Sequence, residues 1–242
     1  MRGMKVRNLH DWQVSTERAF HIQRELASRI SRRSEVAELG LIAGVDISAG
    51  HAQDMATGAV VVMDYPALQL VEVKTVNEKL VFPYIPGLLS FRESPLVLAA
   101  CQKLSVTPDL ILVDGQGLAH PRRLGLASHL GLLLDTPTIG CAKSRLCGHH
   151  EVPTNEPGSF TELVDDGEII GAVLRTKADA SPLYVSIGHK VDLEAAIRWV
   201  LACCRGYRIP EPLRLAHLAA GGNIKEREYI PSPEPTLQGE LF

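Results

Sequence analysis

The pattern of apolar and polar positions predicts one helix and three strands before residue 80. The helix is predicted within residues 11–35, where apolar residues recur at spacings of three and four and Ser15 or Thr16 can cap the start. Three strands are predicted next, at residues 41–47, 58–65 and 68–75. Because their connections are short, these strands are expected to pair antiparallel.

A stiff loop follows the third strand. Tyr84 and Ile85 lie between Pro83 and Pro86, and two prolines so close together restrict the backbone. Two interpretations stay open. The loop either holds its apolar side chains outward, toward a binding partner, or packs them into the core.

The start of the second helix is ambiguous because two serines can cap it. Ser90 and Glu93 match a capping box, but Pro95 would then fall at the fifth helical position, where proline is costly. With Ser94 as the cap, Pro95 takes the favoured first position. We therefore predict a helix from Ser94 to Leu104, with Glu93 just outside it.

Four consecutive apolar residues at 110–113 predict a strand buried on both faces, and Asp114 and Gly115 follow it directly. A lone Asp-Gly pair is more often a simple turn. The remaining predictions, in chain order, are a helix at 124–134, a strand at 138–142, a loop at 151–168, strands at 168–176 and 183–188, and helices at 192–205 and 213–218.

This order of elements predicts an α/β fold of the ribonuclease-H-like kind. Three antiparallel strands come first, and two more strands joined by crossover helices complete a five-stranded mixed sheet in the order 3-2-1-4-5. Further strands and helices follow this core. The first and fourth strands are then neighbours, so Asp46 and Asp114 converge near their ends. Two carboxylates there suit Mg²⁺, which prefers oxygen ligands and supports phosphodiester hydrolysis.

Composition indicates one domain. Of the 242 residues, 45% are hydrophobic and 22% are charged, enough to bury a sizeable core. Residues 1–222 are predicted to form a single catalytic domain. Residues 223–242, with three prolines, are predicted to be a loose tail. No apolar stretch suits a membrane span or a signal core, so a cytoplasmic protein that does not bind membranes is expected.

Net charge and cysteine content restrict how the protein can contact nucleic acid and which metal sites it can form. The net charge is −3, so contact with nucleic acid requires a local basic surface. Residues 115–150 carry four basic residues against Asp135 alone, although a solvated face explains this equally well. Five cysteines without a Cys-x-x-Cys pair argue against disulfides and structural zinc. A zinc site at Cys147, His149 and His150 remains a minor alternative.

Several motifs resemble those of the endonuclease V family of deoxyinosine 3′ endonucleases, and the resemblance runs from about residue 10 to 220. The segments that carry it are Gly44-Val-Asp46, Pro83-Tyr-Ile-Pro-Gly-Leu-Leu-Ser-Phe-Arg-Glu93, Val113-Asp-Gly-Gln-Gly117, His120-Pro-Arg-Arg-Leu-Gly125, Gly140-Cys-Ala-Lys143 and Pro210-Glu-Pro-Leu-Arg-Leu-Ala-His217.

The resemblance assigns roles to individual positions. It implies that four residues form the metal site: Asp46, Glu93, Asp114 and His217. Position 217 is Asp in some relatives, and a lone His in the last helix is also typical of a buried core residue. Lys143 is implied to contact the phosphate or the attacking water. The Tyr84-Ile85-Pro86 segment resembles a strand-separating wedge. The implied pocket for the flipped base is lined by Gly87, Leu89 and Gly115, with His120, Arg122 and Arg123 near the site or the phosphates.

The resemblance implies a monomeric, Mg²⁺-dependent DNA repair enzyme, with Mn²⁺ able to substitute. Its substrate is DNA containing deoxyinosine or other deaminated bases, cut at the second phosphodiester bond 3′ to the lesion to leave 3′-hydroxyl and 5′-phosphate ends. An inosine-specific ribonuclease is the alternative within the class. A nucleotide-binding module is disfavoured, because position 120, where a third fingerprint glycine belongs, is His.

Overall fold

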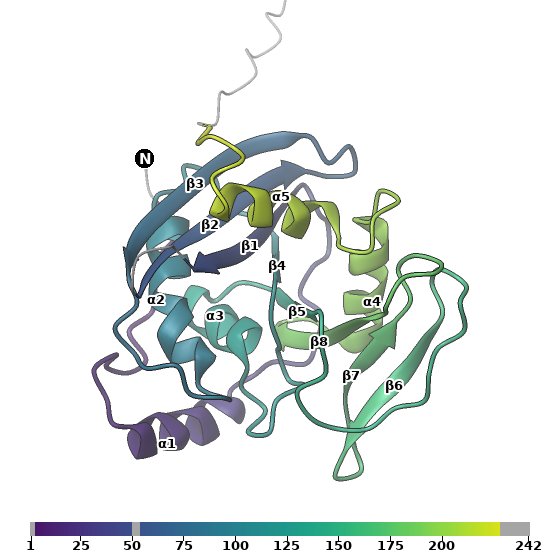
Figure 1. The fold of residues 1–242 in the computed structure, drawn as a ribbon, viewed down its shortest axis with the longest axis horizontal. Coiled ribbons are helices and arrows are strands. Elements are labelled where there is room, and N and C mark those ends of the chain that lie inside the picture. Colours follow the sequence, from purple (N-terminus) through teal and green to yellow (C-terminus); the bar gives the residue numbers. More distant parts are fainter. Residues whose placement is uncertain (1–2, 50–53, 228–242) are drawn as a thin grey trace, which may run out of the picture.

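Eight strands form one mixed sheet in the computed structural model, which describes residues 3–49 and 54–227 (Figure 1). The strands are β1 (Leu41–Ala49), β2 (Met55–Asp64), β3 (Leu70–Lys79), β4 (Leu110–Val113), β5 (Thr138–Ala142), β6 (Phe160–Asp165), β7 (Glu168–Leu174) and β8 (Leu183–His189). Their spatial order is β3-β2-β1-β4-β5-β8-β7-β6. The first five strands have the predicted order, so the ribonuclease-H-like prediction is confirmed.

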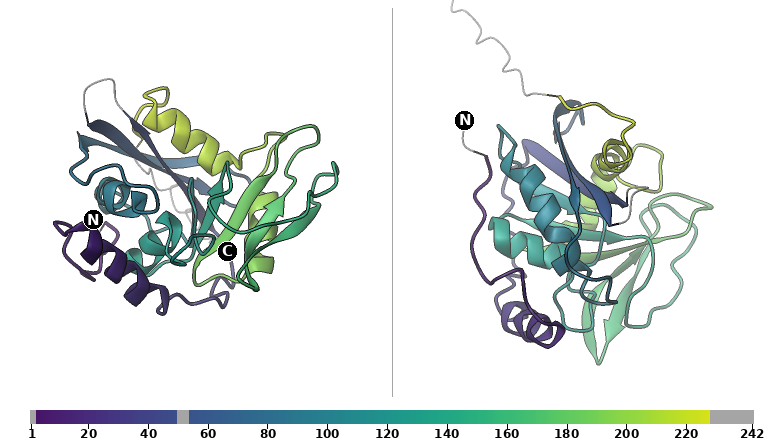
Figure 2. Two further views of the ribbon diagram at one scale, coloured as in Figure 1. Left: turned by 60° about the horizontal axis from the view of Figure 1, so that its bottom comes forward. Right: turned by 60° about the vertical axis from the view of Figure 1, so that its left-hand side comes forward.

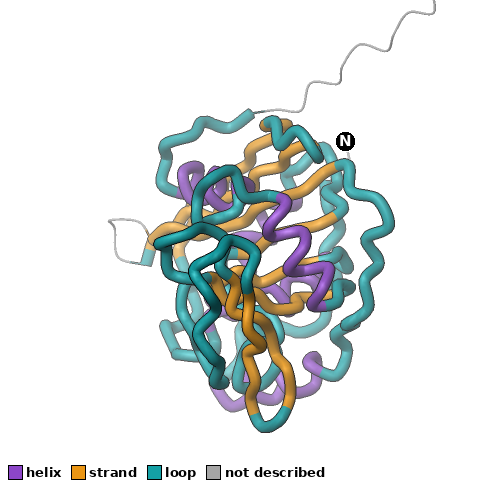
Figure 3. Tube along the Cα trace, turned by 90° about the vertical axis from the view of Figure 1, so that its right-hand side faces the viewer, coloured by secondary structure: helices purple, strands orange, loops and turns teal. Residues whose placement is uncertain are grey.

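Pairing directions also follow the prediction. β1 and β2 pair antiparallel, as do β2 and β3, whereas β4 is parallel to both β1 and β5. The later strands extend the same sheet instead of forming a second one, because β8 pairs antiparallel with β5. β6 and β7 form a hairpin at the far edge, which faces the viewer in Figure 3.

Helices cover both faces of the sheet, as Figure 2 shows for α5 on one side and α2 and α3 on the other. The helices are α1 (Thr16–Ala27), α2 (Leu89–Gln102), α3 (Leu126–Leu134), α4 (Leu193–Ala202) and α5 (Glu211–Ala220). Alternate side chains of β4 enter two different cores: Leu110 and Leu112 pack with α4 and α5, and Ile111 and Val113 pack with α2 and α3. This explains why its four residues are all apolar. None of the described helices combines the length and apolar character needed to cross a bilayer.

Helix α2 begins earlier than predicted. It starts at Leu89, its N-cap residue Leu88 makes no side-chain cap, and Pro95 lies inside it. Both capping interpretations are therefore wrong, and Glu93 belongs to the helix. Proline has no N–H to donate to the carbonyl of Phe91, so one helical bond is lost. Burial of Phe91, Leu96 and Val97 compensates for this loss and keeps the helix continuous.

Two other segments differ from the sequence prediction. Strand β6 lies within the predicted loop at 151–168. Only Leu163 of this strand is buried, and Phe160 is half exposed at the sheet edge, so no continuous apolar run marks it. Residues 223–227, assigned to the tail, attach to β3: Arg227 bridges Val73, and the Glu226 carboxylate accepts hydrogen bonds from Thr75 N and Oγ1 at 2.8 and 2.9 Å. The rest of the predicted tail lies outside the described residues.

Candidate active site

Asp46 and Asp114 lie side by side because their strands are neighbours in register. Val45 of β1 pairs with Val113 of β4, and each aspartate follows its valine directly. The Asp114 N–H donates to the Val45 carbonyl at 3.2 Å, which fixes the offset between the two chains. The parallel pairing thus brings together two carboxylates that are 68 positions apart in sequence.

Both oxygens of the Asp46 carboxylate accept hydrogen bonds. The Ile47 N–H donates to Oδ1 at 2.7 Å, and His217 Nδ1 lies 2.8 Å from Oδ2. The His217 side chain is 65% exposed, so the interpretation as a buried core histidine is wrong. Helix α5 reaches β1 because Gly44 has no side chain: a Cβ there would lie 2.2 Å from the Pro212 carbonyl.

Glu93 faces the two aspartates from α2. Burial is the main cause that raises its pKa to about 7, and the charges of Asp46 and Asp114 add to the effect. Burial and the Asp114 charge likewise raise the pKa of Asp46. The three carboxylates therefore repel one another and favour a cation or a proton between them.

Lys143 supplies a positive charge at this cluster. It follows β5, whose Gly140 pairs with Val113, and its ammonium forms an ion pair with the Asp114 carboxylate. The residue after Lys143 is also held in place, because the Gln116 amide donates to the Ser144 carbonyl at 2.8 Å. The structure thus brings together the five residues predicted to be catalytic.

A cavity of about 460 Å³ opens beside these residues. Residues of the predicted wedge and base pocket also line it, namely Tyr84, Pro86, Gly87, Leu89 and Gly115, together with His120. Tyr84 is 70% exposed, so the outward interpretation holds for its ring. Ile85 differs, because it packs against the apolar cluster beneath α1 and does not line the cavity.

His120 is a buried neutral residue that braces the cavity wall. Burial lowers its pKa to about 4. Its Nδ1 accepts from the Arg122 N–H at 3.1 Å, so the proton sits on Nε2, which donates to the Gly87 carbonyl at 3.0 Å. His120 therefore supports the pocket and carries no charge to offer a phosphate at neutral pH.

The two arginines predicted near the phosphates have different surroundings, and neither lines the cavity. Arg122 donates to the Gly87 carbonyl at 2.8 Å and to the Gln23 side chain. Arg123 forms ion pairs with Asp165 at 2.8 Å and Glu168 at 2.6 Å. Its charge is therefore satisfied inside the protein, and it joins the β6–β7 hairpin to the loop before α3.

Sequence reasoning missed several residues of the cavity. Ser90, Val97, Gln116, Leu126, Arg145 and Leu146 also line it. Arg145 and Leu146 come two and three residues after Lys143, and Leu146 is 45% exposed although it is large and apolar. An apolar side chain next to a predicted phosphate contact is the signal that could have identified this loop.

The donor set suits a hard cation. Asp46, Asp114 and Glu93 offer carboxylate oxygens, the ligands that Mg²⁺ prefers. In their present side-chain positions, Asp46 is hydrogen-bonded to His217 and Asp114 is paired with Lys143. Across residues 3–49 and 54–227, no three His, Cys, Asp or Glu side chains already form a metal-binding group. This applies equally to the zinc alternative at residues 147–150.

Comparison with known proteins agrees with this geometry. A family model described as Endonuclease V matches residues 24–218. Endonuclease V of Dehalococcoides mccartyi is 51% identical over 218 residues, which cover 90% of this chain and 98% of that protein. The crystal structure of endonuclease V from Streptomyces avermitilis has a TM-score of 0.83 at 39% identity, covering 91% of this chain and 96% of that chain.

A third relative was solved with a nucleic acid. Endonuclease V of Ciona intestinalis, in complex with a 23mer DNA containing an inosine followed by a ribo-adenosine, has a TM-score of 0.73 at 28% identity. The match covers 86% of this chain and 98% of that chain. On the strength of the family model and the close relatives, the chain belongs to the endonuclease V family.

Proposed function

We propose that this protein is a Mg²⁺-dependent DNA repair endonuclease that recognises deoxyinosine. It hydrolyses the second phosphodiester bond 3′ to the lesion and leaves 3′-hydroxyl and 5′-phosphate ends. The observation that carries this proposal is the placement of Asp46, Glu93 and Asp114 beside a cavity of about 460 Å³. The acids suit phosphoryl chemistry, and a cavity of this size suits a single extruded base.

The acidic residues hold the cation in this proposal. Asp46, Asp114 and Glu93 bind it through carboxylate oxygens, and His217 either joins them or orients Asp46. Mg²⁺ supplies Lewis acidity that activates water and neutralises charge on the phosphoryl group. Lys143, which is ion-paired with Asp114, would direct its ammonium toward the phosphate or the attacking water.

A second group of residues that line the cavity binds the base in this proposal. Backbone around Gly87, Leu89 and Gly115 reads the hypoxanthine, and the exposed Tyr84 ring enters the duplex in its place. Extrusion of a base costs a few kcal/mol of stacking and pairing, and an apolar wedge offsets part of that cost. Ile85 does not belong to the inserted part of the wedge in this proposal. It anchors the loop, because its side chain packs against the apolar cluster that includes residues of α1.

Cleavage of inosine in RNA is the second candidate. The Ciona intestinalis relative was solved with a ribo-adenosine after the inosine, which supports a ribonucleotide being accepted at the position after the lesion. A ribonuclease distinguishes its substrate through contacts to the 2′-hydroxyl. The two candidate functions use the same acidic cluster. They differ only in whether the protein contacts the 2′-hydroxyl of the sugar.

One experiment separates them. Matched DNA and RNA strands, each with one inosine, are incubated with the protein and Mg²⁺, and both product ends are mapped. Cleavage of DNA at the second bond 3′ to deoxyinosine is expected, with 3′-hydroxyl and 5′-phosphate ends. Preferential cleavage of the RNA strand would favour the second candidate, and cleavage of neither strand would refute both.

A further inference from the structure

We propose that Gln23 of α1 is a positioning residue for base recognition, acting through a three-donor clamp on the carbonyl of Gly87. The clamp consists of Gln23, His120 and Arg122. It fixes the wall of the base pocket before any base enters. This inference rests on the proposed function, because it assigns the cavity to base binding.

The clamp concentrates three donors on one oxygen. The Gly87 carbonyl accepts from Gln23 Nε2 at 2.9 Å, from His120 Nε2 at 3.0 Å and from Arg122 Nη2 at 2.8 Å. A carbonyl oxygen has two lone pairs and usually accepts fewer bonds. The three donors come from two separate segments, α1 and the loop before α3, so they restrict the carbonyl from two directions.

The same peptide group is held at its other end. The Leu88 N–H donates to the Ile85 carbonyl at 2.9 Å, which closes a turn with Pro86 and Gly87 at its centre. Gly87 has φ +79°, and this combination of proline, glycine and hydrogen bond is typical of a type II turn. The peptide between Gly87 and Leu88 is therefore anchored through both its oxygen and its nitrogen.

Gln23 is a polar residue buried among apolar side chains. It is 0% exposed, between Ile22 and Leu26 of the same apolar cluster. A buried amide is costly unless its polar atoms are bonded. All of them are: Nε2 also donates to the Leu124 carbonyl at 3.2 Å, and Oε1 accepts from Arg122 Nε. The amide thus links three segments that meet at the pocket.

Arg122 brings an uncompensated charge to the clamp. Its guanidinium stacks over the Phe20 ring, 4.3 Å from the centroid, and within the described part of the chain no carboxylate lies within 4.0 Å of it. Its hydrogen-bond acceptors are therefore the neutral oxygens of Gly87 and Gln23. A Cβ at Gly87 would lie 2.7 Å from Arg122 Nη2, so a side chain there would displace the guanidinium from the clamp, and the φ of +79° independently favours glycine.

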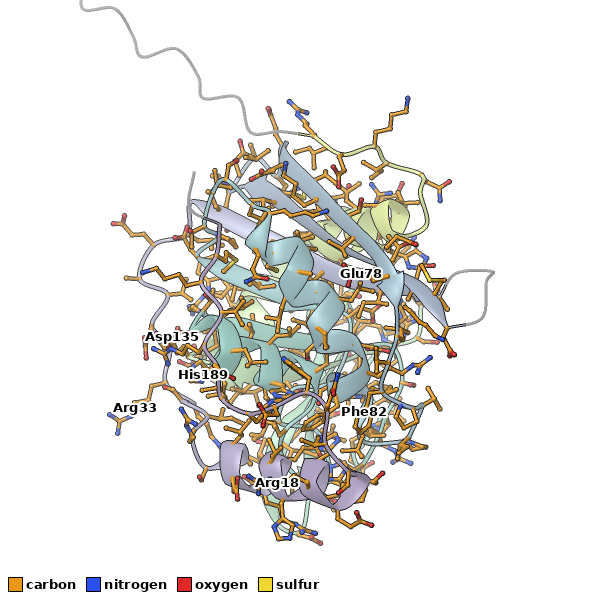
Figure 4. The ribbon with its side chains drawn as sticks, turned by 90° about the vertical axis from the view of Figure 1, so that its left-hand side faces the viewer. Arg18, Arg33, Glu78, Phe82, Asp135 and His189 are labelled. Atoms are coloured by element: carbon orange, nitrogen blue, oxygen red, sulfur yellow. The ribbon has the colours of Figure 1, made fainter. Side chains whose placement is uncertain are left out.

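The clamp makes α1 part of the recognition apparatus. Figure 4 shows this helix crossing beneath α2 and α3, with Arg18 on its surface and Phe82 near the lower end of α2. Gln23 lies one residue before the segment matched by the family model, residues 24–218. A wall fixed in advance spares the ordering cost on binding, which improves affinity and selectivity without any new contact to the ligand.

Two substitutions of Gln23 test the clamp. Gln23→Met keeps the size but removes every polar bond. Gln23→Glu keeps the acceptor for Arg122 and removes the donor to Gly87. In both variants, KM for a single-stranded deoxyinosine oligonucleotide should rise about tenfold, and selectivity over the deoxyadenosine oligonucleotide should fall about tenfold, while kcat changes less. Single strands avoid the separate step of opening a duplex.

Leu26→Ala is the matched control, because Leu26 lies in the same helix and cluster but makes no bond to Gly87. It should lower the melting temperature and leave selectivity unchanged at temperatures where circular dichroism shows it folded. Ile22→Val replaces it if it does not fold. Equal loss of selectivity in the control would overturn the proposal, since a general loosening of α1 would then explain both results.

Hydrogen exchange separates this inference from the proposed function. In the free protein, the Leu88 amide should exchange about tenfold faster in Gln23→Met than in the wild type. Exchange of the Leu88 amide that is no faster in Gln23→Met than in the wild type would overturn the clamp. So would unchanged selectivity in the Gln23 variants, provided that the wild type cleaves deoxyinosine. If the wild type cleaves no inosine substrate, the proposed function fails, and the exchange experiment still decides whether the clamp exists.

Discussion

His217 and Asp46 are hydrogen-bonded, with Nδ1 2.8 Å from Oδ2, although 171 positions separate them in the sequence. The bond joins the last described helix to the first strand. Asp46 shares a face of β1 with Gly44, where α5 approaches closely enough for this contact. The geometry of the acidic cluster therefore depends on how α5 packs against the sheet.

Asp46→Asn and Asp114→Asn should each abolish cleavage while substrate binding persists. In Asp46→Asn the amide oxygen can still accept from the Ile47 N–H, and the amide NH₂ can donate to His217 Nδ1 in the other imidazole tautomer, so shape is kept and the charge is lost. The nicking rate should fall at least about 10²-fold, measured beside the dissociation constant for a deoxyinosine oligonucleotide. Near-normal Mg²⁺-dependent nicking by either variant would exclude that aspartate as an essential metal ligand.

Mg²⁺ should raise the melting temperature of the wild type, because a ligand that binds only the folded state stabilises it. Mg²⁺ should stabilise the folded protein by relieving the repulsion among the three carboxylates. This stabilisation requires no substrate. Asp114→Asn should show a smaller increase in a thermal-denaturation titration with MgCl₂. An equal increase in both proteins would mean that Mg²⁺ acts elsewhere.

Glu93→Gln should reduce nicking far more than stability, since Glu93 caps no helix. Its pKa is raised to about 7 by burial, so the folded state binds more protons than the unfolded state between the ordinary value and 7. Stability of the metal-free wild type should therefore fall as pH rises through this range. The variant should lack this slope and be the more stable protein above pH 7.

Urea denaturation in EDTA at several pH values measures whether the free energy of unfolding falls as pH rises, as the raised pKa of Glu93 predicts. Glu78→Gln is a suitable control, because Glu78 is exposed on β3. An unchanged nicking rate in Glu93→Gln would remove this residue from the metal site. A wild type whose stability is flat across the same pH range would contradict the raised pKa.

Tyr84→Ala should weaken discrimination for deoxyinosine in duplex DNA more than in single strands. The ring is 70% exposed on a loop stiffened by two prolines, so it can enter a duplex at little entropic cost. Nicking rates on both substrate forms measure the effect. Val81→Ala, at a site 82% exposed on the same loop, is the control. An equal loss on both forms would make Tyr84 a general substrate contact.

Arg123→Ala should destabilise the protein and spare its chemistry. The side chain is only 18% exposed and holds two carboxylates of the β6–β7 hairpin, so its loss should cost about 2 kcal/mol of stability. Melting temperature should fall by several degrees, with nicking at low temperature nearly unchanged. Arg33→Ala is the control, because Arg33 points away from the protein in Figure 4. A tenfold loss of DNA affinity would restore a phosphate role.

The sequence was sufficient to predict the meeting of Asp46 and Asp114, because strand order and strand ends follow from hydrophobic runs and short connections. It also offered Ser15 as one of two candidate caps and began a helix at position 192; the side chains of Ser15 and Asp192 each accept from an N–H group three residues ahead. These features are local, or they follow from general rules of sheet topology.

Features that depend on packing between distant segments were not predictable in the same way. Gln23 falls at a buried position of an amphipathic helix, and its partners Gly87 and Arg122 lie 64 and 99 positions away. Arg123 carries the same charge as Arg122, yet the hairpin containing β6 neutralises it. Residue type alone cannot distinguish a phosphate contact from an internal ion pair.

The order in which the chain is synthesised gives the packing of α5 on β1 and β2 a further consequence. The apolar face formed by Ile42, Val61 and Met63 exists once β3 is complete, but the helix that covers it begins at Glu211. About 130 residues must be added in between, which takes on the order of ten seconds on a ribosome. During that interval this apolar face of the nascent chain has no helix to cover it. Asp46 also lacks its hydrogen-bond partner His217. We therefore expect a chain truncated before α5 to aggregate more readily than the whole protein and to have an incomplete acidic cluster.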